Sequence, residues 1–113
     1  MNIKTEAQHA AAFLLSEGNG QISREAITVA AGAALPSGQV LGIDANGKYV
    51  AYDDAAVDTS NIAVGILYAP LAASAEDRFA VGIVRLAEVA AAGLTGLDVA
   101  GAADLKSRNI IAR

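Results

Sequence analysis

The fold is decided by the stretch VLGIDANGKYVAY, residues 40–52, which holds a turn signal between two short apolar runs. Asn46-Gly47 favours the positive φ angles of a two-residue type I′ turn, and the flanking residues alternate as half-buried strands do. The sequence therefore predicts a β-hairpin with Asn46 and Gly47 at its tip. In the register set by that turn, the side chains that face one another across the hairpin are Ile43 with Val50 and Leu41 with Tyr52.

Short apolar runs bounded by turn residues continue on both sides of this hairpin, as in a mostly β protein. Upstream, Ile27 and Val29 alternate with smaller residues, and a glycine- and proline-bearing loop follows over residues 32–38. Downstream, residues 62–68 are nearly all apolar, which is typical of a buried central strand. Further strands are expected over residues 77–89 and 110–112.

One short helix is expected close to the C-terminus. Asp98 is a suitable N-cap, and the helix runs to about Arg108, where Asn109 ends it. Its weak inner stripe is expected to consist of Val99, Ala102, Ala103 and Leu105.

The composition indicates a thin core and association between chains. Hydrophobic residues make up 54% of the sequence and the mean hydropathy is +0.41, yet the chain has only two phenylalanines, three tyrosines and no tryptophan. Large aromatic side chains usually supply much of the buried area, and the abundant alanines supply little. We therefore expect apolar surface to be covered by neighbouring subunits of an oligomer.

Charge and hydropathy exclude several classes of partner. The net charge is -4 and the basic residues form no cluster, so nucleic acid binding is not expected. The uncharged stretches 26–43 and 59–75 are interrupted by glycine, proline and polar residues, so no membrane span is expected. The N-terminus has no secretory signal pattern, which predicts a soluble chain that is made and kept in the cytoplasm. The absence of cysteine excludes disulfides.

The search for catalytic and metal-binding residues predicts that the chain is not an enzyme and takes no cofactor or metal. His9 is the only histidine and lies in a segment that offers it no partner. Asp53 and Asp54 are adjacent, so on a strand they would point to opposite faces. Residues 44–47 differ from a calcium loop because their glycine comes fourth and no bidentate glutamate follows.

The N-terminal segment has the composition of an arm. Residues 1–20 are rich in alanine, glutamate, glutamine and glycine. Thr5 and Gln8 have capping-box spacing, which permits a short helix up to Leu15. An isolated helix of this length is marginal in water, so we favour a flexible arm that orders on a partner, with residues 13–15 as its apolar anchor.

The order of these motifs resembles the lambda-type bacteriophage head decoration proteins. The resemblance spans nearly the whole chain and rests on the spacing of soft motifs rather than on conserved chemistry. The matching strings are FLLSEGNG (13–20), SRE (23–25), ITV (27–29), LPSGQVLG (35–42), KY (48–49), AVGIL (63–67), AEV (87–89) and the segment 105–111.

The resemblance implies a mostly β structure: a small β-barrel or β-tulip-like body with one short C-terminal helix, and an extended N-terminal arm. It implies a homotrimer at threefold positions on the outer surface of the virion capsid, bound to the major capsid protein and stabilising the expanded head, with no cofactor. The arm would span residues 1–25 and the decoration domain residues 26–113. The implied capsid-binding residues are Phe13, Leu14, Leu15, Ser16, Glu17, Gly18, Asn19 and Gly20.

Two other functions compete with this one. A carbohydrate-binding β module would need exposed aromatic platforms, which this sequence is poorly equipped to provide. An enzyme would need a catalytic constellation that the residues do not form. If the arm hypothesis is correct, deleting residues 1–20 should leave a folded trimer that no longer binds heads.

Overall fold

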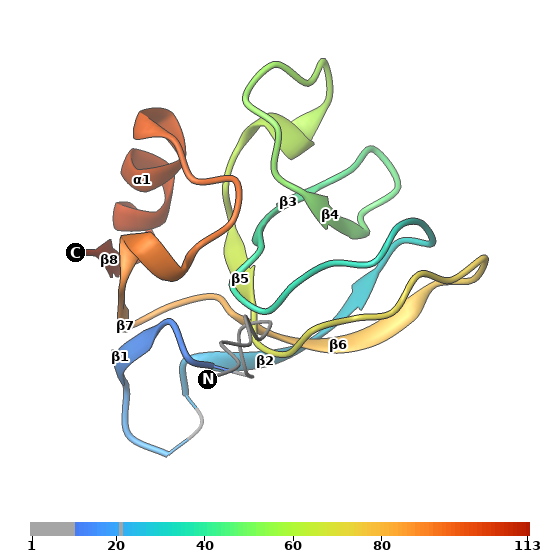
Figure 1. Cartoon of the computed structure of the whole chain (residues 1–113). Coiled ribbons are helices and arrows are strands. Elements are labelled where there is room, and N and C mark those ends of the chain that lie inside the picture. The colour runs from blue at the N-terminus through green and yellow to red at the C-terminus, as the bar shows by residue number, and fades with distance from the viewer. Residues whose placement is uncertain (1–10, 21) are drawn as a thin grey trace, which may run out of the picture.

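The computed structural model describes residues 11–20 and 22–113, which form a barrel and a smaller second sheet (Figure 1). The barrel closes in the strand order β2-β4-β3-β5-β6 and the second sheet has the order β1-β7-β8. One helix, α1 (Val99–Lys106), contacts β8, so the expected mostly β body with a short C-terminal helix is confirmed. The strands are β1 (Leu14–Glu17), β2 (Arg24–Val29), β3 (Val40–Ile43), β4 (Tyr49–Ala51), β5 (Gly65–Leu67), β6 (Arg78–Ile83), β7 (Ala87–Val89) and β8 (Ile110–Ala112), with 3₁₀ turns η1 (Thr59–Asn61) and η2 (Ala91–Gly93).

Two apolar clusters share the central strands β3 and β5. Side chains alternate between the two faces of a strand, so neighbouring residues enter different clusters. Val40 and Ile66 face the larger cluster between the barrel and the second sheet, whereas Leu41 and Leu67 fill the barrel with residues of β2. Residues 65–67 are all buried, which confirms the buried central strand predicted within residues 62–68.

The hairpin exists, but the predicted register is wrong by one residue. The observed pairs are Leu41 with Ala51, Gly42 with Val50, and Ile43 with Tyr49. The cause is the side chain of Asp44, whose Oδ1 accepts hydrogen bonds from the backbone N–H groups of residues 46 and 48, at 2.9 and 3.0 Å. Gly47 has φ +80°, so the tip is a three-residue loop that ends in a left-handed glycine rather than a two-residue turn.

The single strand predicted over residues 77–89 is two strands in different sheets. β6 belongs to the barrel and β7 to the second sheet. The chain bends between them at Leu86, which has φ +51°. A leucine gives no local sign of a left-handed conformation, because such angles are favoured by glycine and asparagine.

The helix begins as predicted, but its buried face is narrower. The Asp98 side chain accepts a hydrogen bond from the backbone N–H of Gly101 at 2.6 Å, and the hydroxyl of buried Tyr52 donates to the same carboxylate at 2.8 Å. Of the predicted inner stripe only Leu105 is fully buried, while Val99 is 89% exposed. Asn109 has φ +61° and directly precedes β8, which confirms that the helix has ended before it.

Several predictions fall on residues that the structure does not describe. Thr5, Gln8 and His9, and with them the choice between a short helix and an extended segment, lie outside the described residues. Within residues 11–20 and 22–113, no helix is long and apolar enough to cross a membrane.

Candidate functional site

Of the predicted capsid-binding residues 13–20, Leu14–Glu17 form β1 at the edge of the second sheet. β1 pairs antiparallel with β7, with a register irregularity between Leu14 and Ser16. Among the described residues, no strand pairs with the other edge of β1. An unpaired strand edge presents a row of N–H and C=O groups to which another extended segment can pair. This part of the chain therefore forms a ready site for strand addition.

Phe13 is part of the body rather than a projecting anchor. Its side chain is 1% exposed and lies in the larger apolar cluster, and its carbonyl oxygen accepts a hydrogen bond from the Ala90 N–H at 2.8 Å. Phe13 therefore packs with the body in the described part of the predicted arm, while the division of the chain into an arm (1–25) and a domain (26–113) stays a prediction. The physical reason is long-range pairing between β1 and β7, which the local composition does not reveal. The capsid-binding role of residues 13–20 stays a prediction.

The turn after β1 is fixed by a buried serine. Ser23 is fully buried, and its Oγ accepts from the Gly18 N–H at 2.8 Å and donates to the Leu86 carbonyl at 2.7 Å. The Gly18 N–H also lies 2.9 Å from the Leu86 carbonyl oxygen. Both hydrogen bonds end on the carbonyl oxygen of Leu86, the residue with φ +51°, and strained backbone of this kind persists only where its surroundings hold it. Sequence reasoning missed Ser23 and Leu86 because their roles arise from a hydrogen bond between residues 63 positions apart in the chain.

Apolar side chains are exposed around this turn. Leu15 on β1 is 55% exposed, and Ile22 and Leu86, which flank Gly18, are 51% and 43% exposed. Leu86 also lines a shallow hollow of about 280 Å³, together with residues of β1, β7 and β8. We call Leu15, Ile22, Leu86 and this hollow the β1 surface. Exposed apolar groups beside an unpaired strand are typical of a protein-binding surface.

Ion pairs hold the strand edge in place. The Arg24 guanidinium lies 2.7 Å from the Glu17 carboxylate and stacks 4.5 Å from the centroid of the Tyr68 ring. On the next strand, Glu88 accepts hydrogen bonds from the Ser16 hydroxyl and the Arg113 guanidinium, both at 2.8 Å. These two donors lower the pKa of Glu88 below its ordinary value. The β1 edge is thus ordered before any partner binds.

Other candidate sites have structural explanations. Asn46 and Gly47 lie at the exposed hairpin tip, where the Asp44 carboxylate accepts a hydrogen bond from the backbone N–H of Asn46. The Asp53 carboxylate accepts a hydrogen bond from the backbone N–H of Ala55 at 3.0 Å, as loop aspartates commonly do. In the described part of the chain, no group of three or more metal-ligating side chains is found.

Comparison with known families finds a match that covers most of the chain. The family model described as bacteriophage lambda head decoration protein D matches residues 3–110. The chain belongs to this family. A search of curated proteins finds no significant match. The family match confirms the resemblance noted from the sequence, and head decoration is a structural role in the phage virion, rather than one that calls for catalytic chemistry.

Proposed function

We propose that this head decoration protein assembles as a homotrimer at threefold positions on the outer surface of the capsid. There it binds the major capsid protein through its N-terminal region and stabilises the expanded shell against the pressure of packaged DNA. The observation that carries this proposal is the family match over residues 3–110. The β1 surface supports it, because it combines exposed apolar side chains with a strand edge to which no other strand of the described residues pairs.

Strand addition gives the attachment a physical mechanism. An extended capsid segment that pairs with the free edge of β1 gains main-chain hydrogen bonds, while Leu15, Ile22 and Leu86 offer apolar contact. In a trimer the second and third attachments are intramolecular, which raises the avidity by about 10² to 10⁴ over a single attachment. A trimer attached to neighbouring capsid subunits then resists their separation.

The structure changes how this attachment should be tested. Deleting residues 1–20 would remove both β1 and buried Phe13, so loss of head binding could reflect loss of folding. Deleting residues 1–10 keeps every described residue. We expect this shorter deletion to remain folded and to bind expanded heads more weakly than the full chain.

Substitutions on the β1 surface complete the test. Leu15→Glu and Ile22→Glu should weaken binding to undecorated expanded heads in a sedimentation assay, because both side chains are exposed. Val57→Glu, at a fully exposed residue in a distant loop, is the matched control. If both β1-surface variants and the shorter deletion decorate heads as well as the unchanged protein, the proposed attachment site is wrong.

A further inference from the structure

An apolar knob projects from the outer face of the β2–β6 pair. Phe79 is 91% exposed and Val81 is 38% exposed, and both lie on the same face of β6. Their cross-strand partners on β2 are Thr28 and Ala26, so no charged side chain stands directly opposite them. A phenylalanine left in water forgoes a large burial free energy, and such a group marks an interaction surface when an apolar site of matching size exists.

An apolar hollow lies at the end of the barrel that carries Phe79. It measures about 200 Å³ and is lined by residues 29–33, Leu35, Val50, Ala51 and Arg78. Apart from Arg78, every lining side chain is aliphatic, or absent as at Gly32. An apolar cavity of about 150 Å³ is sufficient to bind benzene. The hollow is therefore large enough to accept one phenyl ring.

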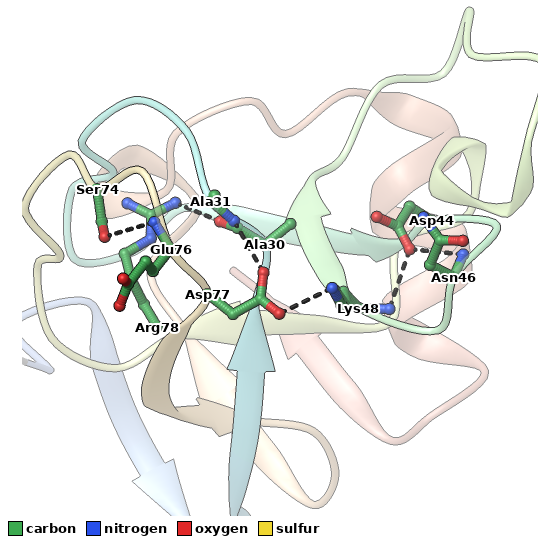
Figure 2. A network of polar contacts seen from close by, with 9 residues as sticks. All are labelled: Ala30, Ala31, Asp44, Asn46, Lys48, Ser74, Glu76, Asp77 and Arg78. Atoms are coloured by element: carbon green, nitrogen blue, oxygen red, sulfur yellow. Dashed lines mark hydrogen bonds and ion pairs between the residues drawn. The ribbon is translucent and has the colours of Figure 1, made fainter.

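The walls of the hollow are fixed by a polar network (Figure 2). The Arg78 guanidinium donates to the carbonyl oxygens of Ala30, Ala33 and Ala72, at 2.8, 2.9 and 2.8 Å. Beside it, Asp77 accepts from the backbone N–H of Ala31 at 3.3 Å and pairs with Lys48 at 2.7 Å. These contacts tie the loop after β2 to the segment before β6 and to the hairpin. The hollow is thus formed before any partner arrives, which lowers the entropic cost of filling it.

Knob and hollow lie on opposite faces of the same pair of strands. Phe79 pairs with Thr28, whereas the next pair, Arg78 with Val29, turns its side chains to the other face and lines the hollow. The knob of one chain therefore cannot fill its own hollow. A twofold interface would need both features side by side on one face, so the contact must run head to tail between copies. Head-to-tail contacts close into rings when the rotation permits.

We propose that Phe79 of each subunit inserts into the hollow between β2, β4 and the loop at residues 30–35 of the next subunit, and that this contact closes the trimer. This inference rests on the homotrimer proposed above and specifies its interface. It makes the β2–β6 end of the barrel the subunit contact and leaves the β1 surface free for the capsid.

The first test is the mass of Phe79→Glu in native buffer. Because the side chain is exposed in the single chain, the variant should fold with an unchanged circular dichroism spectrum. Burying a phenylalanine accounts for about a ten- to hundredfold change in association at each interface, and a buried charge adds to this loss. We expect a monomer at concentrations where the unchanged protein is a trimer. Phe79→Ala should show the same direction with a smaller effect, and Val57→Glu should remain a trimer.

A complementation experiment tests the head-to-tail geometry. Ala51→Phe places a ring in the hollow from an exposed position on β4, so it should block insertion while leaving the knob intact. Each variant alone should be monomeric. A mixture of Phe79→Glu and Ala51→Phe retains one intact knob and one intact hollow, and should form a 1:1 heterodimer but no trimer. A mixture that stays monomeric at concentrations well above those at which the unchanged protein trimerises overturns the geometry.

The outcomes separate this inference from the proposed function. If the unchanged protein is monomeric both free and on heads, the homotrimer fails and the interface fails with it. If the unchanged protein is trimeric and Phe79→Glu stays trimeric, only the interface is wrong. A Phe79→Glu variant that stays trimeric but no longer binds heads would overturn the interface and make Phe79 a capsid contact.

Discussion

Replacing Phe13 with alanine tests whether the N-terminal strand belongs to the folded body. The ring is 1% exposed and lies in the larger apolar cluster. Removing a buried phenylalanine side chain loses its transfer free energy and leaves a cavity, which together cost about 3–5 kcal/mol. Most small domains have a free energy of unfolding of about 5–15 kcal/mol. Phe13→Ala should therefore lower the urea midpoint strongly, measured by circular dichroism at a fixed protein concentration.

Leu15→Ala is the matched control for this experiment. Leu15 lies two residues away but is 55% exposed, so its truncation should cost no more than about 1 kcal/mol. The two variants should differ by several-fold in their loss of free energy of unfolding. Equal urea midpoints for Phe13→Ala and Leu15→Ala would refute the placement of Phe13 in the core, and would favour the separate arm that the sequence alone predicted.

Three further predictions follow from particular contacts. Gly42→Ala should destabilise the protein by about 1–3 kcal/mol in urea unfolding, since a Cβ there would lie 2.6 Å from the Ser60 carbonyl oxygen; an unchanged midpoint would refute this close packing. Asp98→Ala should cost about 1–2 kcal/mol in thermal unfolding, since it removes the α1 cap and the partner of the Tyr52 hydroxyl, and a melting temperature equal to that of the unchanged protein would contradict it. The pKa of Glu88 is lowered in the folded state, so the unfolded state binds more protons and stability falls as the pH drops below the ordinary value of 4.5. Glu88→Gln should show a shallower acid-induced loss between about pH 5 and 3, and an identical acid profile would argue against that ion pair.

The sequence correctly predicted the elements that are determined by residues close together in the chain. The Asp98 cap and the end of the helix before β8 follow from side-chain chemistry within a few residues of each site. The buried strand β5 was predictable because both of its faces pack against apolar clusters, which requires an uninterrupted apolar run. The order of these elements was also sufficient to recognise the family.

The features that the sequence did not predict depend on contacts between distant residues, or on a side chain that changes the geometry of a turn. Asp44 changes the hairpin register because its carboxylate accepts two backbone N–H groups, a choice that the Asn-Gly signal does not reveal. Phe13 enters the core because Ser16 pairs with Glu88, across 72 positions of the chain. The exposure of Phe79 and the position of the hollow depend on the pairing of β2 with β6, so the sequence alone does not show that the two features are related.

The most direct test of the proposed function is binding of the purified chain to expanded heads assembled without a decoration protein. Electron microscopy of the mixture should show density at the threefold positions of the outer capsid surface, with three copies of the chain at each occupied position. Heads that remain bare at saturating protein concentration, or single copies scattered away from the threefold positions, would contradict the proposal.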